Sequence, residues 1–106
     1  MAIYYLMLEA VPLPENKEEK EIAGAFINCW VNSASMESAL TEANDYIQSE
    51  GWKVQKVEDQ FIVNRERYLK DPELQESLEC FDQAVNDGIS SIFYVWPSEE
   101  TDFSGL

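Results

Sequence analysis

The side chains of this chain that could do chemistry are carboxylates, phenols and two thiols, because the sequence contains no histidine. Histidine carries out most acid–base chemistry at neutral pH, since its pKa lies close to that pH. A pair of carboxylates can replace it, as in glycoside hydrolysis. Among 21 Asp and Glu residues, however, close pairs arise by chance, and Glu79 and Asp82 are better explained as the solvated surface of a helix. We therefore expect no catalytic residue and no enzymatic activity.

The two thiols, Cys29 and Cys80, lie in different expected elements. A reactive thiolate needs a neighbouring base or a helix N-terminus, and neither sequence context supplies one. A zinc site would need further ligands at suitable spacing, and a phosphate site would need a glycine-rich loop. We expect two reduced, buried thiols, with no metal site and no cofactor.

The net charge of the chain restricts its partners. Acidic residues outnumber the 7 basic residues and give a formal charge of −14. Such a surface repels nucleic acid and anionic membranes, and it attracts basic proteins. We expect a basic protein partner, no nucleic acid and no membrane, with the alternative that the acidity only keeps the protein soluble.

One predicted helix concentrates this charge. From Asp71 to Leu106 the sequence has acidic residues and no basic one. Like charges at helical spacing lower helix stability, and the helix dipole accounts only for the acids of the first turn. The alternative is an ordinary solvated surface. The predicted partner-binding acidic face consists of Glu73, Glu76, Glu79 and Asp82.

Apolar periodicity and turn residues predict four strands and two helices. One helix follows the capping residues Asn32–Ser35 and ends before Gly51, and the other begins at Asp71-Pro72 and ends near Gly88. The segment Trp52–Asn64 is either one bent strand, which we favour, or two strands joined by a tight turn. Between it and the second helix, residues 64–70 read as a basic loop. The strands are expected at Ile3–Val11, Ala23–Val31, Trp52–Asn64 and Ile89–Trp96.

This order, β-β-α-β-α-β, predicts an α+β fold. We expect a mostly antiparallel sheet of four to five strands with two helices on one face, as a ferredoxin-like two-layer sandwich. One domain is expected over residues 1–97, followed by an acidic and flexible tail over residues 98–106.

Large aromatic side chains are more numerous than one covered sheet face requires. Two helices on one face would leave the other to solvent, and an exposed apolar patch marks an interface or a ligand groove. A homodimer is the simplest such interface. The alternative is that the tail or residues 12–21 cover this face. The predicted aromatic interface or groove consists of Tyr5, Trp30, Tyr94 and Trp96.

The apolar N-terminal stretch Ile3–Leu8 has no preceding basic residue, and no stretch reaches transmembrane length, so we expect a cytoplasmic protein. The favoured function is a non-enzymatic, acidic protein-binding module for a basic protein partner. Small inhibitor and immunity proteins are similar to this chain in size and charge, and the resemblance is one of composition only. The alternative function is a dimeric ligand-binding or regulatory domain that uses an aromatic sheet face.

Overall fold

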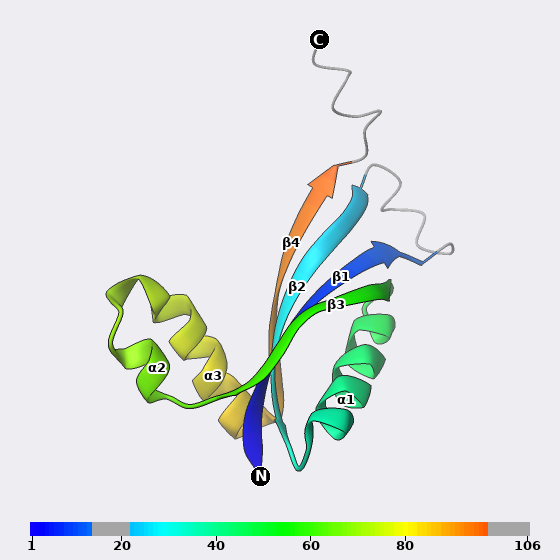
Figure 1. The fold of residues 1–106 in the computed structure, drawn as a ribbon. Helices are drawn as coiled ribbons and strands as arrows, with labels where there is room; N and C mark the ends of the chain where they lie inside the picture. The colour runs from blue at the N-terminus through cyan, green and yellow to red at the C-terminus, as the bar shows by residue number, and fades with distance from the viewer. Residues whose placement is uncertain (14–21, 98–106) are drawn as a thin grey trace.

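An antiparallel four-stranded sheet forms the centre of the protein in a computed structural model that describes residues 1–13 and 22–97 (Figure 1). The sheet order is β3-β1-β2-β4. The strands are β1 (Ala2–Pro12), β2 (Ile22–Ser33), β3 (Trp52–Val63) and β4 (Ile89–Pro97). The helical elements are α1 (Met36–Ser49), α2 (Glu66–Leu69), the 3-10 turn η2 (Pro72–Leu74) and α3 (Gln75–Asp87). The chain is thus a small α+β domain with the expected succession β-β-α-β-α-β, in which α2, η2 and α3 replace the second helix.

The prediction that both helices lie on one face of the sheet is wrong. Figure 1 shows α1 on one side of the sheet and α2 with α3 on the other. The two cores agree with this view, because Leu6 packs in the cluster that contains Ala43 of α1, whereas Ile3 packs in the cluster that contains Phe81 of α3. Successive residues of a strand point to opposite faces. Both faces of the central strands carry large apolar side chains, so each needs its own cover, and the ferredoxin-like two-layer sandwich is not confirmed.

Helix α1 forms as predicted. The Ser35 side chain accepts a hydrogen bond from the backbone N–H of Ser38 at 3.1 Å, and this caps the helix start. Past the other end, Gly51 has a positive φ of 93°, which glycine adopts without steric cost. The helix buries Ala39, Ala43 and Ile47 against the sheet.

Strand β3 is one continuous strand, as we favoured, and its pairing with β1 shifts register twice. The segment after it was predicted as a loop, and this prediction is wrong in part. Residues 66–69 form α2, which buries Tyr68. The predicted cap is confirmed, because the Asp71 carboxylate accepts a hydrogen bond from the Glu73 N–H at 2.9 Å, with Pro72 between them.

The predicted acidic tail and most of the connection between β1 and β2 lie outside the described residues. Within residues 1–13 and 22–97, no helix has the length and apolar character needed to cross a membrane.

Candidate functional site

The sheet face that carries α3 is only partly covered. The helices α2 and α3 pack over the end of the sheet at Ile3 and Val63, and two hollows that share one lining residue lie beyond them. The first has a volume of about 280 Å³ and the second about 450 Å³, and both are lined by Asn28. We call the two hollows together the aromatic groove. The first is lined by Tyr5, Asn28, Trp30, Asp59, Phe61, Arg67, Tyr68, Leu74 and Ser77, and the second by Met7, Phe26, Asn28, Glu58 and Tyr94.

The structure places the four predicted aromatic residues on this one face, but not in one cluster. Tyr5 and Trp30 are directly paired across β1 and β2, and their ring centroids are 5.3 Å apart. Tyr94 lines the second hollow and is 47% exposed. Trp96 lies further along β4, where its ring packs against Phe26 at 5.0 Å. Tyr5, Trp30 and Tyr94 therefore line the groove, whereas Trp96 lies beyond it.

Trp30 forms the floor of the first hollow and is not an exposed interface residue. It is 1% exposed, and its indole N–H donates a buried 2.9 Å hydrogen bond to the hydroxyl of Tyr68 in α2. Phe61 of β3 forms a wall, with its ring centroid 5.0 Å from that of Tyr5. Packed aromatic rings prefer tilted and edge-to-face contacts of this kind. These contacts hold the rings in place, so the walls of the first hollow are formed before a ligand binds.

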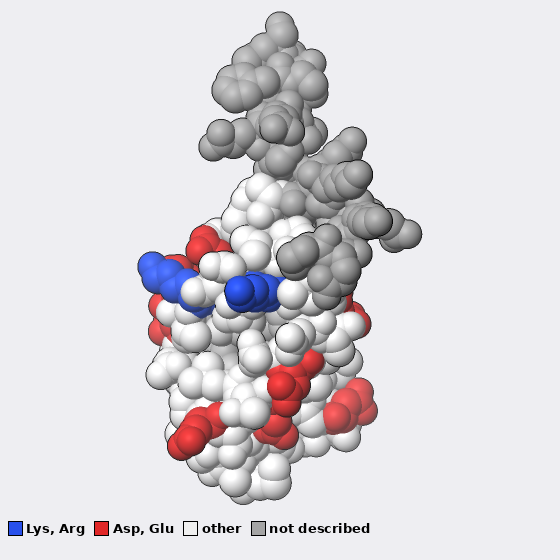
Figure 2. Space-filling view, turned by 90° about the vertical axis from the view of Figure 1, so that its right-hand side faces the viewer, with Lys and Arg blue, Asp and Glu red and all other residues white. Residues whose placement is uncertain are grey.

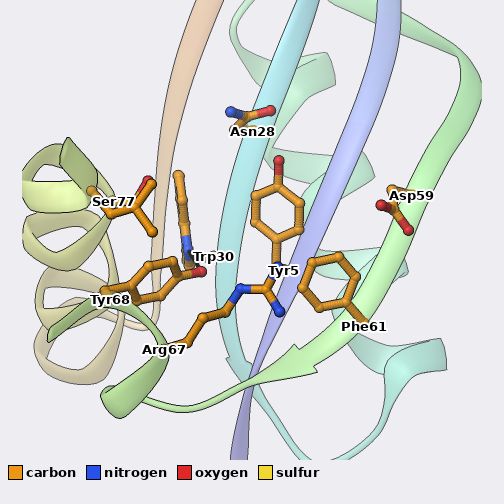
Figure 3. Close-up of a pocket in the computed structure, with 9 residues that line it drawn as sticks. Tyr5, Asn28, Trp30, Asp59, Phe61, Arg67, Tyr68 and Ser77 are labelled. Carbon is orange, nitrogen blue, oxygen red and sulfur yellow. Dashed lines mark hydrogen bonds between the residues drawn. The ribbon is translucent and has the colours of Figure 1, made fainter. Parts of the chain in front are cut away.

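Asn28 supplies an unpaired acceptor in the groove. Its Oδ1 is buried and has no hydrogen-bond partner among the described residues. In Figure 3 Asn28 lies at one end of the first hollow and Arg67 at the other, and the Tyr5 hydroxyl between them points toward Asn28. A buried acceptor without a donor costs about 1–3 kcal/mol, so such groups are rare in folded proteins and call for an explanation such as a bound water or ligand.

Arg67 supplies the positive charge of the first hollow. Its guanidinium carbon lies 4.8 Å from the centroid of the Phe61 ring, in cation–π contact. Asp59 lines the same hollow, and its Oδ1 accepts a 2.9 Å hydrogen bond from the backbone N–H of Gln60. In residues 1–13 and 22–97, the ion pairs are Lys56 with Glu58 and Arg65 with Asp82, and neither involves Arg67.

The phenols of the groove stay protonated at neutral pH. Burial raises the pKa of Tyr5 to about 12, and the neighbouring Tyr68 and the Asp59 carboxylate raise it further than Arg67 lowers it. Burial also raises the pKa of Tyr68. These hydroxyl groups therefore act as hydrogen-bonding groups, not as bases.

The predicted acidic residues lie on the outer surface of η2 and α3 but face different neighbours. Glu73, Glu76 and Glu79 are exposed. Asp82 accepts two hydrogen bonds from the Arg65 guanidinium, at 2.9 and 3.1 Å, and this contact lowers its pKa. Glu76 lies beside the Tyr94 hydroxyl, whose pKa is raised by burial and by this carboxylate. The exposed part of the acidic face is therefore Glu73, Glu76 and Glu79.

The opposite surface carries its charge differently. Figure 2 shows the side of the molecule that carries α1, where acidic side chains are scattered over a mostly uncharged surface. The exposed acids of α1 include Glu37, Glu42 and Asp45.

The two thiols lie on opposite faces of the sheet. Cys29 is fully buried beside α1, and burial raises its pKa to about 12. Cys80 is half-buried in α3, so the prediction that both are buried is wrong for it; burial, Glu76 and Glu79 raise its pKa. Among the residues that the structure describes, no three His, Cys, Asp or Glu side chains are grouped to hold a metal ion.

Sequence reasoning missed Asn28, Phe61, Arg67 and Tyr68. Asn28 carries a local signal, because it is the polar residue between Phe26 and Trp30 on the same face of β2. Arg67 and Tyr68 carry none, because their place depends on how α2 docks.

Comparisons of this chain with protein-family models, with curated proteins and with solved structures find no match.

Proposed function

We propose that this protein is a non-enzymatic binding protein that takes a small flat ligand into the aromatic groove. The observation that carries the proposal is the Oδ1 atom of Asn28, a buried acceptor on a residue that lines both hollows, without a hydrogen-bond partner among the described residues. A ligand N–H or O–H that reaches this atom would satisfy it. The rings of Tyr5 and Phe61 supply flat apolar walls on which such a ligand can stack.

The protonation states in the groove support binding over catalysis. A general base works best with a pKa near the operating pH. The Tyr5 pKa of about 12 is far above neutrality, so its hydroxyl is a poor proton acceptor.

The test compares indole with 1-methylindole, two flat neutral probes that differ by the N–H donor. Each is titrated into nitrogen-15-labelled protein. Indole is expected to bind with an affinity of about 1 mM, the range for a fragment of this size, and to shift the side-chain N–H signals of Trp30 and Asn28. The Trp52 indole signal is the internal control, because Trp52 packs in the core beside α1. Removing the donor is expected to weaken binding about fivefold, the loss of roughly one hydrogen bond.

Two variants separate Asn28 from its surroundings. Asn28→Leu is expected to bind both probes equally, since the acceptor is gone while the branching and the number of heavy side-chain atoms are kept. Asn86→Leu makes the same change at an exposed position of α3 and is expected to keep the preference for indole. Shifts at Trp52 as large as those at Trp30, or no shift at Trp30, would remove the basis of the proposal.

A second candidate function is the recognition of a basic protein partner through the exposed acids of η2 and α3. Its support is that Glu73, Glu76 and Glu79 are exposed and that none of the ion pairs in the described parts involves them. Complementary charge chiefly raises the rate of association and makes it sensitive to salt.

This candidate is tested on a partner recovered from native lysate at low salt. Changing Glu73, Glu76 and Glu79 to Lys is expected to slow association by about tenfold and to flatten its salt dependence. The matched control changes Glu37, Glu42 and Asp45 of α1 to Lys, which alters net charge equally on the opposite side. Equal effects of the two triple variants would show that only net charge matters.

A homodimer is supported by the edge strand β4. Its residues Ile89–Pro97 include no charged side chain, and Tyr94 and Val95 are 47% and 53% exposed. Charged side chains normally protect the edge strands of a sheet from pairing with another chain. Lys53 and Lys56 do so on the other edge strand, β3. Light scattering after gel filtration is expected to give a dimer that Val95→Lys converts to a monomer. A monomeric mass for the parent protein at high concentration would exclude this arrangement.

A further inference from the structure

The position of Arg67 restricts the ligand class of the aromatic groove. Arg67 offers a ligand a positive charge, whereas Asn28 offers it a neutral hydrogen-bond acceptor. The Arg67 guanidinium carbon lies 4.8 Å from the centroid of the Phe61 ring, in cation–π contact, and the guanidinium carries five N–H groups in one plane. Those groups form a planar fork that matches the two oxygens of a carboxylate.

In the described parts of the chain, the neighbouring ion pairs leave the Arg67 guanidinium without a carboxylate partner. Between residues 53 and 70, Lys56 pairs with Glu58 at 3.3 Å and Arg65 pairs with Asp82 at 2.9 Å. Within the described ranges Arg67 has the ring contact but no such pair. Asp59 lines the same hollow, yet its carboxylate accepts from the Gln60 backbone instead of from Arg67.

The backbone holds Arg67 in this place. Its backbone N–H donates hydrogen bonds to the side-chain oxygen and to the backbone oxygen of Asn64, at 3.2 and 3.3 Å. Asn64 lies at the turn that leads from β3 into α2. Its neighbour Tyr68 is anchored to Trp30 by the buried hydrogen bond. The segment that carries Arg67 is therefore held in place, and the Arg67 side chain lines the first hollow.

We propose that the ligand of the aromatic groove is a flat aromatic acid, whose carboxylate binds the Arg67 guanidinium while its N–H donor binds Asn28 Oδ1. This inference rests on the proposed binding function and adds the sign of the ligand charge. In Figure 3 the two polar groups lie at opposite ends of the Tyr5 ring, so the flat part of the ligand lies along that ring. The many distant carboxylates of the chain oppose an anion only weakly at physiological salt, where charges are screened beyond about 8 Å.

The test compares indole-3-acetate with tryptamine in physiological salt. Both carry the same ring and the same N–H donor, and they differ in the sign of their charge. Indole-3-acetate is expected to bind at least about fivefold more tightly than tryptamine, with neutral indole between them, as the shifts of the Trp30 and Asn28 side-chain signals report. This expected difference in affinity corresponds to one exposed charge pair between ligand and protein, supported by stacking of the ligand ring.

Three variants assign the preference to Arg67. Arg67→Gln is expected to bring the affinities of indole-3-acetate and tryptamine to a ratio near one, and Arg67→Lys is expected to retain part of the difference. Arg65→Gln changes an arginine two residues away that faces Asp82, so it is expected to leave the preference intact. Unchanged signal dispersion shows that each variant is folded.

The outcomes separate this inference from the function on which it rests. Tryptamine binding as tightly as indole-3-acetate would overturn the inference and show that Asp59 dominates the hollow, while the shifts by indole would still support a binding groove. A preference for the acid that survives Arg67→Gln would also overturn it. No shift at Trp30 with any of the three probes would overturn both.

Discussion

The indole N–H of Trp30 donates a 2.9 Å hydrogen bond to the hydroxyl of Tyr68, across 38 positions of sequence. Both residues are buried, and the bond joins the centre of the sheet to the short helix α2. Because α2 carries Arg67 beside Tyr68, the same bond sets one wall and the charged end of the aromatic groove. A four-residue helix is unstable alone, so its tertiary contacts keep the segment in place, among them this bond and the Tyr68–Phe81 ring contact at 6.0 Å.

Tyr68→Phe is expected to lower the free energy of unfolding by about 1–3 kcal/mol, because it leaves the Trp30 N–H buried without an acceptor. The measurement is urea unfolding followed by circular dichroism. Tyr94→Phe, which removes a hydroxyl from an exposed ring, is the matched control and is expected to change stability by less than about 0.5 kcal/mol. Equal effects of the two changes would mean that the Trp30–Tyr68 bond contributes nothing.

How much of this arrangement can be predicted from the sequence depends on how far apart in the sequence the interacting residues lie. Helix α1 is set locally, by the Ser35 cap and the spacing of Ala39, Ala43 and Ile47, and its prediction is confirmed. The face that each helix covers is not local. It depends on the path of the chain after β3, where α2 turns α3 onto the face opposite α1.

The candidate site divides in the same way. Alternation along β1 and β2 places Tyr5 and Trp30 on one face, and Asn28 follows from the same period of two. The groove forms because the helices that cover this sheet face end before Asn28. The docked position of Tyr68 sets the edge of that cover. No local sequence pattern near Arg67 predicts how Tyr68 docks, because Tyr68 contacts Trp30, which is distant in sequence.

Gly24→Ala is expected to destabilise the protein by about 1–3 kcal/mol through overpacking. A Cβ on Gly24 would lie 2.5 Å from the Trp96 ring and 3.0 Å from the backbone oxygen of Ala10. The Trp96 ring must move away from Gly24, so the tryptophan emission is expected to change together with the urea midpoint.

The matched control for this change is Gly88→Ala. Gly88 has a φ of 96° and nothing within 4 Å of an added Cβ. Its replacement is expected to cost about 1–2 kcal/mol from backbone conformation alone and to leave the Trp96 emission unchanged. A Gly24→Ala protein with parental stability and parental emission would contradict the close packing of Trp96 on β2.

The contact between Arg65 and Asp82 predicts a component of acid sensitivity. The hydrogen bond from Arg65 lowers the pKa of Asp82 in the folded protein. Its stabilising contribution is therefore present above the unfolded pKa of about 3.9 and is lost as the pH falls through the lower folded value. Asp82→Asn and Arg65→Gln are each expected to flatten the dependence of unfolding free energy on pH below about 4.

Both groups of this pair are exposed, so the effect is expected to be small and to shrink as salt is added. The measurement is urea unfolding from neutral pH down to the acid limit of folding, at low and at high salt. The two variants should give the same pH profile, since each breaks the same pair. An acid limb that persists in both variants would assign this sensitivity to other carboxylates.

Tyr5 predicts a loss of stability at alkaline pH. Its pKa rises from 10.0 to about 12 in the folded protein, mainly because burial disfavours the phenolate. A group whose folded pKa is raised stabilises the protein fully below its unfolded pKa, and this contribution is lost as the pH rises through the folded value. The window therefore runs from about pH 10 to about pH 12.

Phenolate absorbance is expected to show a late step near pH 12, and unfolding free energy is expected to decline across the same window. Tyr5→Phe should remove both. An absorbance titration of Tyr5→Phe that still contains the late step would assign the high pKa to another tyrosine, such as Tyr68 or Tyr94, whose pKa values burial also raises.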